Sequence, residues 1–262
     1  MFPCVSGVRR EPAVIASALQ ARQGGESRTA VSQRLGIPVA TLRTWENGRV
    51  PRPVHALLAG VPVCPACGWH HPLDDLGPEY AYLLGVYLGD GYLVRHARTM
   101  ALKVALDVAY PGIIDEVARS ITTVMGRRPH VTRDPVRAMV LVTSYWQGWP
   151  CLFPQHGPGR KHDRDVTLTP WQESIAVAHP GPLARGLIHT DGWRGENRVV
   201  SKGREYRYPR YQFSNRSSDI RTIFCVACDT LGVDWRPWGP WHISVARRDA
   251  VARLDTHIGP KL

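Results

Sequence analysis

The chain carries one pattern twice, as LLGVYLGDG at residues 83–91 and ARGLIHTDG at residues 184–192. Each copy is a largely apolar helical segment that closes with Asp-Gly, and Pro78 and Pro182 are the expected helix-start signals. Small residues recur four positions apart, and such positions lie on one face of a helix. Each helix therefore has a smooth face that a second helix backbone can approach closely. The small residues are Gly85 and Gly89 in the first copy and Gly186 and Thr190 in the second.

The two helices are expected to pack side by side through these faces. Asp90 and Asp191 would then lie at the same end of the pair, with carboxylates close enough to share metal ions. A helix C-terminus carries partial negative charge, which also favours a cation there. The alternative is a pair of ordinary core helices, each with an aspartate near its C-terminus. A repeat with matching spacing favours the functional pair.

Together the two motifs resemble the LAGLIDADG homing endonucleases in their single-chain, two-motif form. The resemblance implies an α+β fold of two pseudo-symmetric αββαββα half-domains in a monomer, with the motif helices at their interface. It also implies that saddle-shaped sheets hold double-stranded DNA while Asp90 and Asp191 bind Mg²⁺ or Mn²⁺ and cut it. The carbonyls of Gly89 and Thr190 would be further metal ligands.

The resemblance also implies basic residues near the metals, which the family uses to stabilise transition-state charge. Lys103 and Lys202 are the candidates, and the alternative is that both are solvated or contact phosphates. The chain departs from the family at the sixth motif position, where Leu88 and His189 replace an acidic residue. On a packed helix interface, His189 is expected to form a structural hydrogen bond.

The segments after the two motifs also repeat. The spacing of apolar residues predicts the order helix, strand, helix, strand in each half. In the first half the elements after the motif are expected at 100–106, 111–126 and 139–143. In the second half they are expected at 207–213, 217–232 and 242–246, followed by a closing helix at 249–257. Pro209 favours an edge strand, or a strand that begins just after it.

Residues 28–49 form the pattern of a helix-turn-helix, with Gly36 at the turn. The run from Leu35 to Arg49 resembles phage-repressor-type domains, which implies that a helix from Pro38 to Asn47 enters the major groove of DNA. Arg49 and Arg52 would reach phosphates. The alternative is a three-helix structural or protein-binding module. The residues expected to face bases are Val39, Ala40, Arg43 and Thr44.

Shifts in composition divide the chain. The expected parts are a DNA-binding domain at 1–60, a linker at 61–78, and a LAGLIDADG domain at 79–262 with halves at 79–165 and 166–262. The linker contains the pair Cys64 and Cys67, and zinc needs four ligands, which only His70 and His71 could complete nearby. The alternatives are one Zn²⁺ site or a plain turn with two thiols.

The charge balance favours a polyanionic partner. The net charge is +11, from 33 Lys and Arg against 22 Asp and Glu, and phosphate contacts by such residues release counterions. The sequence shows neither a signal peptide nor an apolar run of spanning length, which predicts a cytoplasmic protein without membrane contact. Candidate DNA contacts around the predicted strands are Arg95, Arg98, Arg198, Arg207 and Arg210.

Two functions fit these features. The first is a sequence-specific, metal-dependent endonuclease that hydrolyses phosphodiester bonds in duplex DNA. The second is a helix-turn-helix transcriptional regulator with a LAGLIDADG domain that has lost catalysis. The paired aspartates favour the nuclease, because a protein that only binds DNA has no need of two carboxylates facing phosphates.

Overall fold

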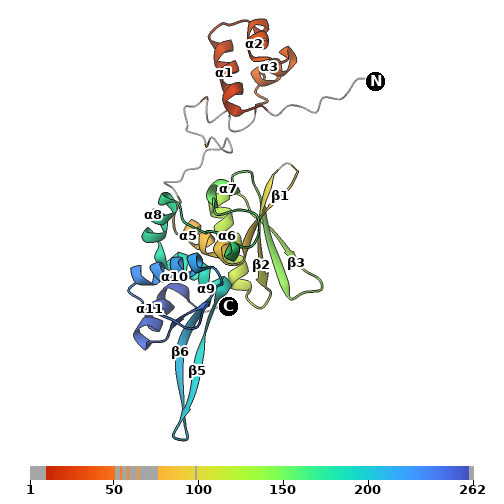
Figure 1. Ribbon diagram of the computed structural model, residues 1–262. Coiled ribbons are helices and arrows are strands. Elements are labelled where there is room, and N and C mark those ends of the chain that lie inside the picture. The colour runs from red at the N-terminus through yellow and green to blue at the C-terminus, as the bar shows by residue number, and fades with distance from the viewer. Residues whose placement is uncertain are drawn as a thin grey trace. The chain divides into compact units, whose positions relative to one another are not determined.

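The computed structural model describes residues 10–50, 54, 58, 64, 76–97 and 99–259. The chain forms two compact units, an N-terminal unit within residues 1–72 and a C-terminal unit within 73–262 (Figure 1). Within the described residues, every helix is too short or too polar to cross a bilayer.

The N-terminal unit contains three short helices, α1 (Pro12–Gln23), α2 (Arg28–Leu35) and α3 (Val39–Glu46). The Ser27 hydroxyl caps α2 by accepting a hydrogen bond from the Ala30 amide. Gly36 ends that helix in the left-handed region, with φ 58°, where glycine has no steric penalty. Ion pairs from Arg22 and Arg28 to Glu46 tie α3 to the other two helices.

The first half of the C-terminal unit begins with the first motif helix. Its elements are α5 (Pro78–Leu88), β1 (Gly91–Arg95), β2 (Met100–Asp107), α6 (Pro111–Met125), β3 (His130–Arg133) and β4 (Met139–Tyr145). The four strands form an antiparallel sheet in the order β1-β2-β4-β3. Alternation places Leu102 and Val104 on the face that packs into the core. The segment between the halves contains α7 (Trp149–Leu152), a 3-10 turn η2 (Lys161–Asp163) and α8 (Pro170–Ala178).

The second half repeats this topology. Its elements are α9 (Pro180–Asp191), β5 (Gly192–Ser201), β6 (Arg204–Ser214), α10 (Ser218–Thr230), β7 (Arg236–Pro237), β8 (His242–Val245) and α11 (Arg248–Ile258). The sheet order β5-β6-β8-β7 corresponds position by position to that of the first half. The predicted α+β fold of two similar half-domains is therefore confirmed.

The strand prediction was incomplete. Sequence spacing gave one strand between each motif and the next helix, whereas the structure has two, because β1 and β5 follow the motifs at once. Gly91 and Gly192 thus begin strands, and α9 begins at Pro180 rather than after Pro182. Pro209 lies inside β6, where it pairs with Glu196 of β5. Only Tyr211–Ser214 of β6 pair with β8 among the described strands, so Pro209 has an open side, as in an edge strand.

Candidate functional site

The two motif helices, α5 and α9, pack with their backbones in direct contact. A Cβ added to Gly186 would lie 2.2 Å from the Tyr82 carbonyl oxygen, and one added to Gly85 would lie 2.5 Å from that of Leu183. Further along, a Cβ on Gly89 would lie 2.1 Å from the Thr190 hydroxyl oxygen. These four small residues therefore all lie at the contact between α5 and α9. The close approach brings the C-terminal ends of both helices together.

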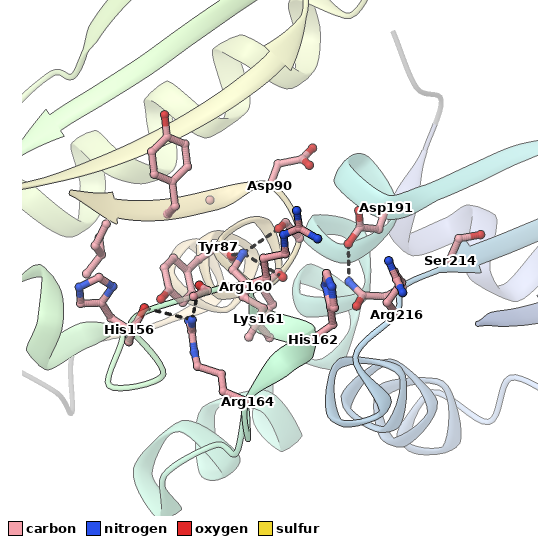
Figure 2. Close-up of a pocket in the computed structure, with 18 residues that line it drawn as sticks. Tyr87, Asp90, His156, Arg160, Lys161, His162, Arg164, Asp191, Ser214 and Arg216 are labelled. Carbon is pink, nitrogen blue, oxygen red and sulfur yellow. Dashed lines mark hydrogen bonds between the residues drawn. The ribbon is translucent and has the colours of Figure 1, made fainter. Parts of the chain in front are cut away.

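Asp90 and Asp191 line one cavity of about 650 Å³ at this end of the helix pair (Figure 2). The residue before Asp90 lies close to Asp191, because a Cβ added to Gly89 would be 3.2 Å from Asp191 Oδ2. The cavity therefore has one carboxylate from each half. The two are held differently: α9 runs through Asp191, whereas α5 ends at Leu88 and leaves Asp90 in the turn before β1. Asn215 Nδ2 donates a 2.6 Å hydrogen bond to Asp191 Oδ2.

Lys161 also lines this cavity, although no motif in the sequence predicts it there. It comes from the segment between the halves, and its Nζ donates to the carbonyls of Tyr87, Leu88 (3.1 Å) and Gly89 (2.7 Å) at the end of α5. Burial lowers the pKa of Lys161 to about 8, while the carboxylates of Asp191 and Asp90 act in the opposite direction. The Gly89 carbonyl, a predicted metal ligand, thus already accepts a hydrogen bond from an ammonium.

A basic loop surrounds Lys161. Arg164 organises it, donating from Nη1 to the Gly157 (3.0 Å) and Gly159 (2.8 Å) carbonyls and from Nη2 to that of Gln155 (3.0 Å). The cavity therefore combines two carboxylates with a ring of cationic or titratable groups, which suits a phosphate-bearing ligand bound with metal. The other basic residues that line it are His156, Arg160, His162 and Arg216.

The carboxylate pair fits Mg²⁺ or Mn²⁺. Within the part of the chain that the structure describes, no three His, Cys, Asp or Glu side chains gather as a metal cluster. Mg²⁺ commonly takes one or two carboxylates and completes its shell with water and substrate phosphates, so two aspartates in an open basic cavity suffice. The Thr190 hydroxyl donates to the Gly186 and Leu187 carbonyls of its own helix. Its carbonyl, the predicted further ligand, stays a prediction.

Strand register separates the two predicted catalytic lysines. Lys103 of β2 pairs with Tyr92, two residues after Asp90, and is half-buried on the face of the sheet opposite the core. In the second half, the residue two positions after Asp191 is Trp193, and it pairs with Gln212. The counterpart of Lys103 is therefore Gln212, and the expectation for Lys202 requires correction.

Lys202 lies in the turn between β5 and β6, with φ 49°, next to Gly203. The whole of β5 separates it from Asp191, and at the rise of an extended strand this is about 30 Å. Figure 1 shows the hairpin extending away from the helices. Lys202 is therefore too distant to act on a phosphate bound at Asp191.

The predicted DNA contacts on the sheets fall on different faces. Arg210 lies on the open face of β6, opposite Gly195. Arg198 and Arg207 pair with each other on the face that carries Tyr211 and Phe213 into the core, and Arg207 also contacts Glu205 and Glu196. These two arginines thus do not share one surface with Arg210. Arg95 is exposed at the end of β1, and Arg98 lies outside the described residues.

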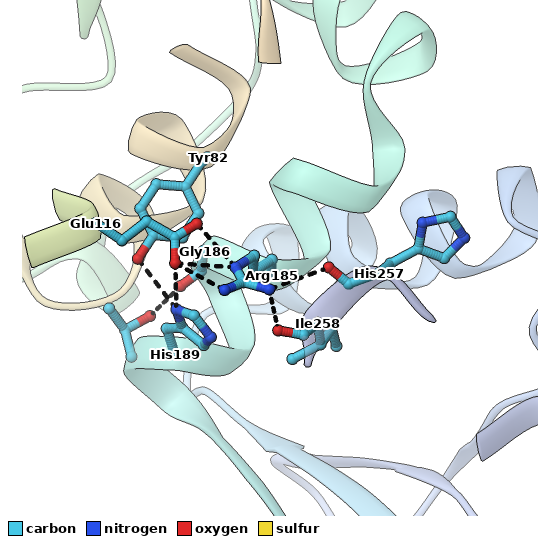
Figure 3. Close-up of polar contacts among 8 residues, drawn as sticks. Tyr82, Glu116, Arg185, Gly186, His189, His257 and Ile258 are labelled. Carbon is cyan, nitrogen blue, oxygen red and sulfur yellow. Dashed lines mark hydrogen bonds and ion pairs between the residues drawn. The ribbon is translucent and has the colours of Figure 1, made fainter. Parts of the chain in front are cut away.

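His189 joins the two halves through the polar contacts of Figure 3, and it is not among the residues that line the cavity. Its side chain is buried, and Nδ1 lies 3.0 Å from Tyr82 Oη and 3.8 Å from Glu116 Oε2. Arg185, one turn earlier on α9, holds the same Glu116 carboxylate at 2.8 Å and donates to the Ile258 carbonyl. The sixth motif position therefore contributes a polar contact between α9 and the first half.

In the N-terminal unit, the residues expected to face bases share the outer surface of α3. Val39, Ala40, Arg43 and Thr44 are all exposed, while Leu42 and Trp45 are buried beneath them. Arg49 is exposed just after the helix, and Arg52 lies outside the described residues. Of the predicted zinc ligands, Cys64 is half-buried, and Cys67, His70 and His71 lie outside the described residues.

No protein-family model matches the chain, and no curated protein matches it. Solved structures with similar backbones include the I-SmaMI LAGLIDADG homing endonuclease bound to cleaved DNA, at 12% identity and TM-score 0.47, covering 71% of this chain and 84% of that one. Another is I-DmoI in complex with DNA and Mn, at 13% identity and TM-score 0.47, covering 71% of this chain and 98% of that one. Backbone similarity at such low sequence identity does not assign an activity to this chain.

Proposed function

We propose that the protein binds double-stranded DNA as a monomer and hydrolyses a phosphodiester bond in each strand, with Asp90 and Asp191 as the metal-binding carboxylates. One observation carries this proposal: two aspartates from two similar half-domains line one basic cavity, at the end of a helix pair in backbone contact. A twofold arrangement of carboxylates matches the approximate twofold symmetry of a duplex.

The charged residues in and near the cavity have stated tasks in this proposal. Asp90 and Asp191 hold Mg²⁺ or Mn²⁺, which would polarise the phosphoryl oxygen and activate water for attack. Asn215 fixes the orientation of Asp191 through its 2.6 Å hydrogen bond. Arg160 of the loop and Lys103 at the first sheet are the candidates to neutralise phosphate oxygens as the duplex enters. Lys161, whose three N–H groups bind carbonyls of α5, contributes positive charge beside the two carboxylates.

The full-length protein can test this directly. Duplexes bound from a random pool identify the preferred site, and a plasmid carrying that site then reports cleavage in Mg²⁺. Failure to enrich any duplex would contradict the proposed binding, whatever the outcome with metal.

Lys161→Met provides a test that needs no DNA. The change keeps about the length of the side chain and removes a charge that interacts with both carboxylates. Close unit charges in a partly buried site interact by up to a few kcal/mol. We therefore expect Mn²⁺ to bind at least about tenfold more tightly, measured by calorimetry. Lys161→Arg is the charge-conserving control and should show no gain. Weaker or unchanged Mn²⁺ binding by Lys161→Met would show that the ammonium does not oppose a cation at these two carboxylates.

We further propose that the N-terminal unit is a helix-turn-helix that reads a separate stretch of the same duplex through α3. Arg43→Ala should cost about 1–3 kcal/mol of binding to the selected site if the guanidinium contacts a guanine, and should broaden the selected sequences. Arg34→Ala is the control, because it removes the same charge from α2, where Arg34 forms an exposed ion pair with Glu26. Equal losses for the two variants would show that Arg43 contributes charge alone.

A further inference from the structure

The segment between the halves reaches the end of α5 through the side chain of Lys161 (Figure 2). Its ammonium donates hydrogen bonds to the carbonyls of three consecutive residues, Tyr87, Leu88 and Gly89. It also lies 5.0 Å from the centroid of the Tyr87 ring. An ammonium has three N–H groups, so these carbonyls use all of them. The contacts of Lys161 are thus those of a small cation held by oxygen atoms and one aromatic ring.

This site follows from the place where α5 ends. The last carbonyls of a helix have no partner within the helix and carry partial negative charge. Helix α5 ends at Leu88, two residues before Asp90, whereas α9 continues through Asp191. In α9 the Thr190 hydroxyl donates to carbonyls of its own helix, but the matching residue of α5 is Gly89, which has no side chain. The first half therefore uses a group from outside the helix.

The loop that carries Lys161 is anchored on both sides. Before it, the buried Gln155 donates a 2.5 Å hydrogen bond to the side chain of Gln172 in α8. After it, the Val166 amide donates a 2.8 Å hydrogen bond to Asp219 of α10. Burying an ammonium costs free energy unless polar groups surround it. A loop fixed at both ends, with its lysine fully hydrogen-bonded, holds this charge at one defined place.

We propose that Lys161 is a positioning residue, whose ammonium permanently fills a monovalent-cation site at the end of α5 and so holds the turn that carries Asp90. This inference rests on the proposed function for the role of Asp90. The Gly89 carbonyl, held at 2.7 Å, directly precedes Asp90, so that hydrogen bond fixes the backbone from which the carboxylate extends. Asp191 is supported differently, because it belongs to α9 and accepts a hydrogen bond from Asn215. Loss of the ammonium should therefore affect the two halves unequally.

Strand-resolved cleavage by the full-length protein measures this inequality. The Asp90→Asn variant first identifies the strand whose cleavage depends on Asp90. Lys161→Ala should then slow cleavage of that strand by about tenfold to a hundredfold relative to wild type, because small misplacements of a catalytic group have effects of this size. The other strand should keep nearly its wild-type rate, whereas a loss of stability alone would slow both strands alike. Lys161→Met should show the same inequality, and its gain in Mn²⁺ affinity reflects charge, a separate effect.

Chemical rescue tests the cation site itself. Lys161→Ala leaves space for a free ammonium ion, so ammonium chloride should raise the Tm of this variant and restore cleavage of the slowed strand. Tetramethylammonium chloride at the same concentration has the same charge but no N–H group, and should do neither. Two controls should not respond to ammonium. The side chain of Lys161→Met fills the space, and Arg160→Ala removes a charge that lines the same cavity.

Equal slowing of the two strands by Lys161→Ala, or an equal response to the two salts, would overturn this inference. A Lys161→Ala protein that stays unfolded in ammonium chloride would overturn it as well. If the wild-type protein cuts neither strand, the proposed function fails instead. The effect of ammonium on the Tm of Lys161→Ala still reports on the cation site in that case, so the two failures are distinguishable.

Discussion

Asp90→Asn and Asp191→Asn together are expected to lower double-strand cleavage by at least about a thousandfold while leaving duplex binding intact. Each substitution keeps the shape of the side chain and removes a charged metal ligand from the cavity. Binding should even improve slightly, because a carboxylate no longer faces a phosphate. The measurement is the rate of plasmid linearisation in Mg²⁺, with affinity measured on the same duplex in Ca²⁺.

The single variants give a finer test. The two aspartates belong to opposite halves, so each single substitution should leave residual nicking of one strand, which end-labelled duplexes resolve. Asp191 is additionally held by Asn215, so Asn215→Ala should weaken cleavage without removing a metal ligand. If the double variant still linearises the plasmid at the wild-type rate, these carboxylates are not catalytic.

Gly186→Val is expected to have the largest effect on stability. Its Cβ would lie 2.2 Å from the Tyr82 carbonyl oxygen and 2.9 Å from the Val86 amide nitrogen. Both are backbone atoms, so α5 and α9 must separate, and the polar contacts of His189 and Arg185 would shift with them. We expect a loss of about 3 kcal/mol, which lowers the Tm of a unit of this size by about 6–12 °C.

Gly77→Val is the matched control for this prediction. Gly77 precedes α5, and the nearest atom to an added Cβ, a carboxylate oxygen of Glu79, is 3.9 Å away. Its backbone has negative φ, so the change should cost about 1 kcal/mol or less. Calorimetric unfolding of both variants provides the comparison. Equal Tm values would contradict the close packing of the two helices.

The sequence predicts those helices in which apolar or small residues recur at helical spacing. Gly85 and Gly186 stand at the spacing that marks one smooth face, and α6, α10 and α11 have clear apolar stripes. The missed strands lack such a signal: every residue of β3 is exposed, and β5 is polar with two glycines. Their pairing depends on a neighbouring strand, a tertiary effect that overrides local propensity.

Of the charged residues in the candidate site, only the two carboxylates could be predicted from the sequence. Asp90 and Asp191 belong to the motif, so the sequence placed them together. Lys161 lies in a loop far along the chain from both, and only folding brings its ammonium to the end of α5. Pairing Lys103 with Lys202 failed for a related reason, because strand register, invisible in composition, makes Gln212 the counterpart of Lys103.

The most direct test of the central claim is cleavage of the selected site by the wild-type protein. A supercoiled plasmid carrying that site is incubated with the full-length chain in Mg²⁺, Mn²⁺ or Ca²⁺. The proposed function predicts linear product in Mg²⁺ and Mn²⁺ and none in Ca²⁺, which prefers looser and higher coordination. Tight binding to the site with no linear product in any of these metals would contradict it, and would leave a DNA-binding regulator instead.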